Sequence, residues 1–316
     1  GLLPGDKILA VDGKEMKGKK SNEVTDFLKG KSGTTLQLTI EREGEGEIVK
    51  SITRENIKMK NVPYYGIIED NIGYVKLTGF TPNAGKEVRD AVVKLKEQGA
   101  DKIALDLRGN GGGLLHEAIN IVNVFVPRGE TIVITKGKFK EDNKVYKTLN
   151  TPVDTEIPVV VLIDKGSASA SEIVSGSLQD LDRAVLIGQN SFGKGLVQTT
   201  KRLTYNTSMK ITTAKYYIPS GRLIQRLDYG NKVNGKAIAV ADSIKTQFKT
   251  KNGRSVVDGE GIQPDVKVDA HKYSKIAQSL IKNNLVFWYA NLYRSEHDSI
   301  VEPMNYDVTD NEYEEF

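Results

Sequence analysis

The sequence predicts a mixed α/β fold (α/β with α+β character) that follows a small β-rich module. Two observations lead to this prediction. From about residue 63, apolar runs typical of strands alternate with segments whose apolar residues recur at helical spacing. Before that point, over residues 1–60, strand patterns predominate. A chain of 316 residues with 38% hydrophobic residues is also long enough for two domains and a sizeable core.

The N-terminal module begins with an expected strand that runs into a turn over residues 7–13. A short helix is predicted over 21–29, with Ser21 as its N-cap and Gly30 at C′. The side chains expected to face inward from this helix are Val24, Phe27 and Leu28. Residues 35–40 alternate between polar and apolar, which indicates a half-buried strand.

The first strand–helix–strand unit of the larger part starts with an expected strand at 72–77. A helix that ends at Gly99 follows it. The apolar face of this helix consists of Val88, Ala91, Val92 and Leu95. A second strand at 102–107 leads into the glycine loop 109–113. The helix beyond that loop is marked by Leu115, Ala118, Val122 and Phe125.

The pattern continues through the second half of the chain. Residues 158–163 form a nearly continuous apolar run, as expected of a strand that is covered on both faces. A helix is predicted to begin near Ala170, and a strand returns at 184–188. Residues 197–226 are expected to be β-rich, and 273–293 are expected to be helical.

Composition excludes several classes of function. The 45 basic and 41 acidic residues nearly cancel to a net charge of +4, and no Lys/Arg block stands out, so we expect no nucleic-acid binding. The count of 0 cysteines excludes disulfides, thiol catalysis and Cys-zinc sites. No apolar run approaches the roughly 18 residues of a membrane helix, so we expect no transmembrane span.

The first candidate site is the serine-rich segment 166–172. Ser169 and Glu172 fit a capping box, in which the two side chains close the first turn of a helix in a purely structural role. The same position suits a nucleophile, because the free N–H groups of a helix N-terminus favour a developing oxyanion. The small neighbours Ala168 and Ala170 leave room for a substrate backbone. Taken alone, the segment leaves both interpretations open.

A serine nucleophile needs an adjacent base. Three histidines are available, but His116, His271 and His297 have no flanking pattern that indicates a triad, which is defined by geometry. Lys194 lies between two glycines, beside Phe192 and after an apolar strand. A lysine can act as a base near neutral pH when burial lowers its pKa by about 3, which lies within the known range. Lys194 is therefore the better candidate.

Two segments resemble nucleotide-binding motifs, but each lacks a residue that its motif requires. Residues 188–194 match the spacing of a phosphate loop, but Gly195 stands where Ser or Thr should bind magnesium, and a strand pattern follows. In the loop 108–113, a dinucleotide fingerprint would need a further glycine where Leu114 stands. The glycine loop instead supplies backbone N–H groups that can hold an anion or an oxyanion.

Together these motifs resemble those of the carboxy-terminal processing peptidases, also called tail-specific proteases. Five segments stand in the order of that family, namely residues 106–115, 164–172, 191–198, 213–225 and 259–266. Any one of them would be weak evidence, but five in order are specific. The family usually has proline where this chain has Gly111.

The resemblance implies that Ser169 is the nucleophile, Lys194 the general base and Gln198 the residue that orients that lysine. The oxyanion hole that it implies consists of the backbone N–H groups of Ala170 and of Gly112 or Gly113. If residues 194–198 are extended, Gln198 and Lys194 share a face, because side-chain direction repeats at every second residue. The family implies no metal and no cofactor.

The resemblance also implies an organisation into domains. Residues 1–60 resemble the second half of a PDZ domain, a partial module in which the helix 21–29 would line the peptide groove. Residues 61–270 would form a Ser-Lys peptidase core with a crotonase/ClpP-like fold. Residues 271–316 would form a helical C-terminal extension, expected to be a truncated tail that helps a homodimer to form.

The implied function is that of a serine endopeptidase with a Ser-Lys dyad. It would cleave peptide bonds in or near the C-terminal tails of unstructured or envelope proteins, so its partners would be protein or peptide tails. The implied location is the bacterial cell envelope, either the periplasm or the membrane surface. A catalytically silent peptide-binding or scaffold protein of the same fold is the alternative, because a fold does not determine activity.

Overall fold

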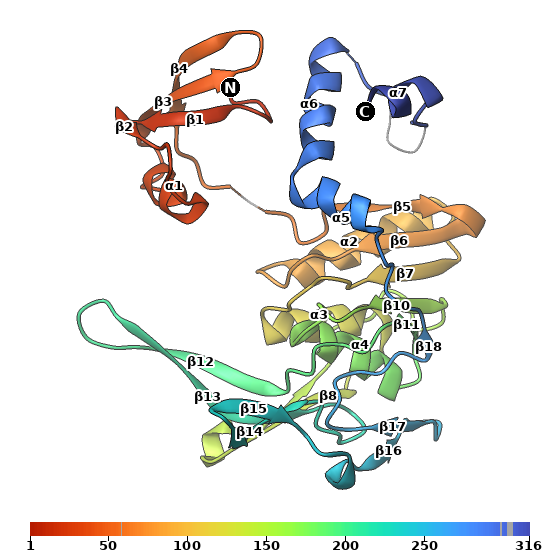
Figure 1. The fold of residues 1–316 in the computed structure, drawn as a ribbon. Coiled ribbons are helices and arrows are strands. Elements are labelled where there is room, and N and C mark those ends of the chain that lie inside the picture. The colour runs from red at the N-terminus through yellow and green to blue at the C-terminus, as the bar shows by residue number, and fades with distance from the viewer. Residues whose placement is uncertain (58, 298, 302–305) are drawn as a thin grey trace. The chain divides into compact units, whose positions relative to one another are not determined.

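The computed structural model describes residues 1–316 except 58, 298 and 302–305 (Figure 1). The chain divides into two compact units. One is Met59–Ala270, which contains the expected site residues, and the other combines Gly1–Lys58 with His271–Phe316. The larger hydrophobic core lies in the first unit, and a smaller core lies under the N-terminal sheet.

The N-terminal segment is an antiparallel four-stranded sheet with the order β2-β1-β3-β4. Its strands are β1 (Lys7–Val11), β2 (Lys14–Glu15), β3 (Thr35–Arg42) and β4 (Gly46–Thr53). The helix α1 (Ser21–Leu28) packs the three predicted apolar side chains against this sheet. The predicted cap is wrong by one residue, because Lys20 occupies the N-cap and its N–H donates to Glu23 Oε2 at 2.8 Å.

The larger unit is built on a six-stranded sheet with the order β18-β11-β10-β7-β6-β5. The parallel strands are β6 (Ile72–Lys76), β7 (Lys102–Asp106), β10 (Val159–Ile163), β11 (Val185–Gly188) and β18 (Val266–Lys267). The edge strand β5 (Tyr64–Ile68) is antiparallel to β6. The predicted α/β core is therefore confirmed.

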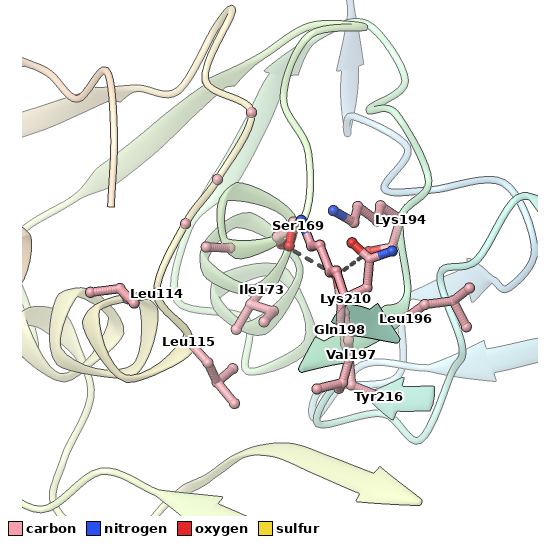
Figure 2. A pocket seen from close by; sticks show the side chains of 14 residues that line it. Leu114, Leu115, Ser169, Ile173, Lys194, Leu196, Val197, Gln198, Lys210 and Tyr216 are labelled. Atoms are coloured by element: carbon pink, nitrogen blue, oxygen red, sulfur yellow. Dashed lines mark hydrogen bonds between the residues drawn. The ribbon is translucent and has the colours of Figure 1, made fainter. Parts of the chain in front are cut away.

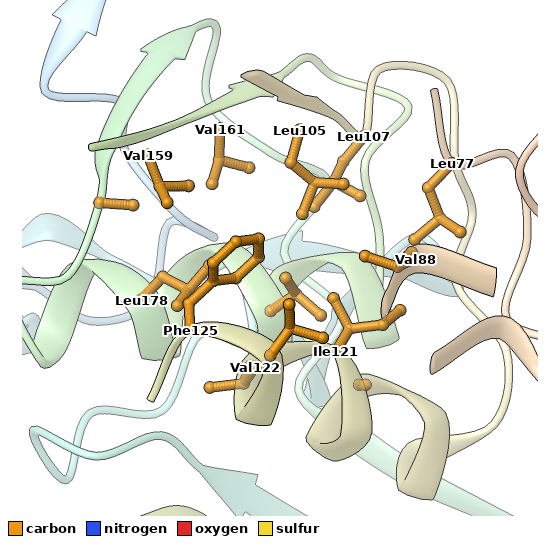
Figure 3. Packing of buried hydrophobic residues seen from close by; sticks show 14 of the residues in the cluster. Leu77, Val88, Leu105, Leu107, Ile121, Val122, Phe125, Val159, Val161 and Leu178 are labelled. Carbon is orange, nitrogen blue, oxygen red and sulfur yellow. The ribbon is translucent and has the colours of Figure 1, made fainter. Parts of the chain in front are cut away.

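Three helices pack against this sheet, namely α2 (Ala84–Glu97), α3 (Leu115–Phe125) and α4 (Ala170–Asp180). Figure 3 shows apolar side chains of the strands facing those of the helices. Phe125 of α3 is 0% exposed in this layer. Its truncation to alanine would cost about 3–5 kcal/mol of stability, a value typical of a buried aromatic residue. The same core includes side chains of α4, so it also holds in place the helix that begins directly after Ser169.

A second, antiparallel sheet has the order β12-β13-β8-β9. Its strands are β8 (Thr131–Gly137), β9 (Lys144–Lys147), β12 (Leu196–Arg202) and β13 (Ser208–Tyr217). Two further hairpins pair β14 (Leu227–Val233) with β15 (Lys236–Ala239), and β16 (Gln247–Lys249) with β17 (Ser255–Val257). The short 3-10 helices are η1 (Glu69–Asn71), η2 (Lys140–Asp142) and η3 (Asp242–Ile244).

The C-terminal segment contains α5 (Lys275–Lys282), α6 (Leu285–Glu296) and α7 (Asp310–Glu315). Residues 273–293 are therefore largely helical, as predicted, but they belong to two helices. Asn284 adopts a left-handed conformation with φ 56°, which interrupts the helix and which asparagine tolerates better than most residues. None of the described helices combines the length and the apolar character that crossing a bilayer requires.

Candidate active site

The expected site residues lie around one pocket of about 400 Å³ (Figure 2). Its walls come from the glycine loop after β7, the start of α4, and the strands β12 and β13. The residues that it brings together include Gly112, Gly113, Ser169, Ala170, Lys194 and Gln198. Segments that lie far apart in the sequence are therefore joined at one place.

The parallel sheet explains why the two loops meet. β7 and β10 are neighbours, with Asp106 opposite Leu162, so the glycine loop and the serine turn leave the same edge of the sheet. The backbone carbonyl of Asn110 accepts hydrogen bonds from the Ala168 N–H at 3.0 Å and from the Ser171 hydroxyl at 2.8 Å. These bonds hold the glycine loop against the turn that carries Ser169.

Asp106, at the end of β7, anchors the start of the glycine loop. Its carboxylate accepts hydrogen bonds from Arg108 Nη2 at 2.7 Å and from the Tyr74 hydroxyl at 2.6 Å. Burial alone would raise the pKa of Asp106, but the hydrogen bonds from Arg108 and Tyr74 outweigh it and lower the pKa to about 2. The side chain is 0% exposed, so this charged cluster is firmly held.

Ser169 has an unusual backbone conformation. Its φ is 57° and its ψ is −111°, a region that costs a non-glycine residue conformational energy and is typical of functional turns. Its N–H donates to Glu172 Oε2 at 2.7 Å, which is one half of the expected capping box. Within the described residues, the Ser169 hydroxyl makes no cap hydrogen bond in return. The hydroxyl is thus not engaged in capping the helix, and Ser169 lines the pocket.

Gly112 allows the glycine loop to approach this turn. Its φ is +92°, and a Cβ there would lie 2.5 Å from the Ala168 carbonyl oxygen and 2.7 Å from the Ala170 nitrogen. Only glycine fits this approach. At Gly111, by contrast, a Cβ would meet nothing within 4 Å, so this position accepts a side chain.

The backbone amides around the pocket differ in what they bind. The Gly112 N–H donates to Asn110 Oδ1 at 3.0 Å. The amides of Gly113 and Ala170 have no intramolecular acceptor among the described residues. Ala170 is also the first residue of α4, where the helix dipole favours negative charge. Of the two predicted glycines, Gly113 is therefore the one whose amide is available.

Glu172 links the serine turn to the segment that carries Lys194. Its Oε1 accepts hydrogen bonds from the Ser191 hydroxyl at 2.5 Å and the Gly193 N–H at 2.6 Å. Its Oε2 accepts the Ser169 N–H at 2.7 Å and the Lys194 N–H at 2.9 Å. Burial raises the pKa of Glu172, while the four donors favour its charged form. The sequence pattern predicted the bond to Ser169 but not the other three.

Tyr216 of β13 is a second connecting residue, which sequence reasoning missed. Its hydroxyl hydrogen-bonds to the Lys194 carbonyl and lies 3.3 Å from the Ser169 carbonyl oxygen (Figure 2). Burial raises the pKa of Tyr216 well above its ordinary value, with a further contribution from the charge of Glu172. The hydroxyl therefore remains a hydrogen-bond donor. Its tyrosine lies in the matched segment 213–225, but no spacing rule indicated this contact.

Lys194 is partly buried, and its Nζ forms no hydrogen bond or ion pair with the described residues. Lys194 and Ser169 thus line the same pocket without a direct hydrogen bond. The expectation that Gln198 shares a face with Lys194 by strand alternation stays a prediction, because β12 begins only at Leu196. The register shift between Val197 and Gln198 places its extra residue, Thr213, in the partner strand β13. Gln198 nevertheless lines the pocket.

The alternatives to a serine–lysine site find no support in this unit. His116 is its only histidine; the side chain is 65% exposed, and its Nε2 lies 3.4 Å from Glu117 Oε1, away from the pocket lining. A phosphate loop would open a helix after Lys194, but the strand β12 follows instead, as the strand pattern predicted. Within the described parts of the chain, no three His, Asp or Glu side chains cluster in a way that could hold a metal.

The chain resembles proteins of one peptidase family. The model of "Peptidase family S41" matches residues 71–232, and that of "Probable PDZ-protease, C-terminal helical domain" matches residues 276–316. The chain is 43% identical over 230 residues to a carboxy-terminal-processing protease of Bartonella bacilliformis, which covers 71% of this chain and 52% of that protein. It is 34% identical over 290 residues to a "Probable CtpA-like serine protease" of Staphylococcus aureus, covering 91% and 50%.

Among solved structures, the photosystem II D1 C-terminal processing protease is similar, with 26% identity and a TM-score of 0.51. That match covers 84% of this chain and 63% of the other. The chain spans about half the length of the curated relatives that it matches. The family model covers half of the chain, from the start of β6 through the serine turn and both pocket strands. The protein therefore belongs to peptidase family S41.

Proposed function

We propose that this chain is a serine endopeptidase that cleaves peptide bonds in or near the C-terminal tails of unstructured or envelope proteins. The observation that carries the proposal is the pocket in which Ser169, on a strained turn at a helix N-terminus, lies with Lys194 and Gln198. The names of the relatives, which include carboxy-terminal-processing and serine proteases, support the same reaction.

In the proposed mechanism, the neutral amine of Lys194 takes the proton of the Ser169 hydroxyl while Oγ attacks the peptide carbonyl. The N–H groups of Ala170 and Gly113 bind the oxyanion, since both lack an intramolecular acceptor among the described residues. Protonated Lys194 then gives its proton to the leaving amine. Neutral Lys194 next takes a proton from a water molecule that attacks the acyl carbonyl. The bond to Ser169 Oγ then breaks, and Lys194 returns the proton to Oγ, which restores the serine.

The reaction requires Lys194 Nζ to reach hydrogen-bond distance of the Ser169 hydroxyl. Catalytic hydrogen bonds are often long in a free enzyme and shorten when substrate binds. The backbone of Lys194 is already held by Glu172 and Tyr216, so the change falls on the flexible lysine side chain. Gln198, which lines the same pocket, is proposed to orient the amine.

The pocket lining supports an apolar substrate side chain beside the scissile bond. Its apolar wall is formed by Leu114, Leu115, Ile173, Leu196 and Val197. Full burial of a Val, Leu or Phe side chain contributes about 1.5–3 kcal/mol, which is enough to select apolar tails over polar ones. The preference can be measured as the ratio of kcat/KM values for peptides that differ only in the residue beside the scissile bond.

The direct test replaces Ser169→Ala and Lys194→Ala, one at a time, and measures cleavage of an unstructured protein. We expect each substitution to lower kcat by a factor on the order of 10⁴ to 10⁶, as in other enzymes that depend on an activated serine. Lys165→Ala is the matched control, because this exposed lysine does not line the pocket. Near-normal activity of either site variant, with an unchanged melting temperature, would refute the assignment.

The alternative function is that of a silent peptide-binding or scaffold protein, and one observation favours it. The Ser169 hydroxyl and the Lys194 amine share no hydrogen bond among the described residues. A fluorophosphonate probe separates the two functions, since it labels only an activated serine. Labelling that disappears in Ser169→Ala supports the peptidase. No labelling with or without a bound peptide supports the scaffold.

The family resemblance supports three further parts of the proposal. The N-terminal sheet with α1 is proposed to be part of a PDZ module that presents substrate tails, in keeping with the "PDZ-protease" match of the C-terminal segment. Residues 271–316 are proposed to assist a homodimer, and the cell envelope is the proposed location. Analytical ultracentrifugation of the intact chain and of one that ends at residue 270 tests the dimer. Cell fractionation tests the location.

A further inference from the structure

A second lysine, Lys210, lines the same pocket as Ser169 and Lys194 (Figure 2). It belongs to β13 and is exposed, while Lys194 is partly buried. The proposed mechanism uses one lysine as a base and leaves Lys210 without a role. Its exposure suits contact with an incoming ligand better than proton abstraction from a partly buried serine.

The strand register places Lys210 beside Gln198. In the antiparallel pair of β12 and β13, Thr200 lies opposite Lys210, and Gln198 lies opposite Thr212. Opposite residues share a face, and so do residues two apart in one strand. Gln198 and Lys210 are therefore diagonal neighbours on the pocket face, within reach of long side chains. The register shift lies before Gln198, so it does not disturb this relationship.

The charge of Lys210 has no counter-charge within the pocket. No Asp or Glu lines it, and Lys210 forms no ion pair or side-chain hydrogen bond with the residues that the structure describes. Glu172, the carboxylate of the adjoining turn, already has both oxygens occupied by four donors. A surface lysine is usually only a solvated charge. Lys210 differs because it faces the space in which a substrate must lie.

We propose that Lys210 is a specificity-determining residue whose ammonium group binds a carboxylate of the substrate close to the scissile bond. This inference rests on the proposed peptidase function of the same pocket. The carboxylate can belong to an Asp or Glu side chain or to the C-terminus of the substrate, and the two sources offer the same chemistry. Gln198 and the apolar wall then bind the neutral parts of the peptide.

The test uses a set of quenched fluorescent peptides with one apolar scissile sequence. In one series, Glu or Gln stands at each of the positions that flank the cleaved bond. In the other, the cleaved bond lies near a C-terminus that is either a free acid or an amide. For each pair, kcat and KM are measured for the wild type, Lys210→Ala, Lys210→Arg and Lys210→Glu.

We expect the wild type to prefer the acid of at least one pair by about tenfold in kcat/KM, mainly through KM, since a charged hydrogen bond contributes on that order. Lys210→Ala should abolish this preference, because it should lower kcat/KM for the acid peptide more than for the neutral one. Lys210→Arg should retain the preference, and Lys210→Glu should reverse it. The pair that responds identifies the source of the carboxylate.

Lys201→Ala is the matched control, because Lys201 is an exposed lysine of the same hairpin that does not line the pocket. The inference is overturned if the wild type shows no acid preference, or if Lys210→Ala keeps that preference unchanged. The proposed peptidase function is not affected by either result. Cleavage that persists in Ser169→Ala, or wild-type protein that cleaves none of the peptides and takes no fluorophosphonate, overturns the proposed function itself. Equal loss in Lys201→Ala and Lys210→Ala also overturns the inference.

Discussion

Glu172 Oε2 accepts a hydrogen bond from the backbone N–H of Lys194 at 2.9 Å. The same oxygen accepts the N–H of Ser169, so one carboxylate holds the proposed nucleophile and the proposed base in a fixed relation. Glu172 is 0% exposed, and water therefore does not compete for these bonds. The residue does not touch the reacting atoms, and its role is to position the two segments that do.

Replacement of Glu172→Gln should lower kcat on the order of a hundredfold. The new NH₂ group would face N–H donors, which breaks part of the network and destabilises the fold by about 1–3 kcal/mol. Peptide cleavage and thermal unfolding measure the two effects. Glu117→Gln is the control, because its buried carboxylate accepts the N–H groups of Asn83 at 3.0 Å and Gly85 at 2.7 Å. If both variants lost kcat equally, the positioning role of Glu172 would be disproved.

Neighbouring glycines of the loop should respond in opposite ways to alanine. Gly112→Ala should abolish activity, because the new Cβ would lie 2.5 Å from the Ala168 carbonyl oxygen and φ is +92°. Gly111→Ala should retain activity, since its Cβ meets nothing within 4 Å. The reduced freedom of the unfolded chain could even add about 0.4–1 kcal/mol. Kinetics and denaturant titration of the two variants test the contrast, and similar losses in both would contradict it.

Removal of the Tyr216 hydroxyl should slow catalysis by about tenfold, with a stability loss near 1 kcal/mol. Tyr216→Phe keeps the buried ring but removes the contact with the carbonyls of Lys194 and Ser169. The adjacent Tyr217→Phe is the control, because Tyr217 stacks under Lys136, with Nζ 4.8 Å from the ring centroid, and does not line the pocket. A kcat for Tyr216→Phe equal to that of the control would exclude the hydroxyl from the positioning of the site.

Acid should weaken the fold through Asp106. Its pKa in the folded protein is about 2, below the ordinary value of 3.8, so its stabilisation is present above pH 4 and is lost as the pH falls toward 2. The difference corresponds to about 2 kcal/mol. Denaturant titrations at pH 5 and below should show that Asp106→Asn lacks this part of the acid sensitivity. An unchanged slope of stability against pH in Asp106→Asn would contradict the prediction.

The sequence predicted the central sheet well because its strands and helices carry strong, local periodicity. β7 and β10 lie within one residue of their expected bounds, and so does the start of α4. The break at Asn284 was missed because a left-handed residue leaves the apolar pattern on either side intact. The cap of α1 was misplaced because the glutamate at position 23 suits a helix that begins one residue earlier.

The expected site residues do line one pocket, but the contacts that position them could not be predicted from the sequence. The bonds of Glu172 to Gly193 and Lys194 join segments about twenty residues apart in the chain, and only the packing of the sheet brings them together. The same limit applies to Tyr216, whose partners lie on two other segments. The strand-alternation argument for Gln198 stays a prediction, because Lys194 lies before the start of β12, where no strand pairing fixes the direction of its side chain.

The shared carboxylate of Glu172 has a consequence for protein engineering. A chimaera that takes only the segment around Lys194 from a homologue would combine the backbone N–H groups of that homologue with the Glu172 carboxylate of this chain. The hydrogen bonds of Gly193 and Lys194 to Glu172 would then be at risk. The serine turn and the lysine segment therefore have to be exchanged together, although they are separate in the chain. Loop grafting should transfer residues 169–172 and 191–198 together, and directed evolution should show epistasis between mutations in the two segments.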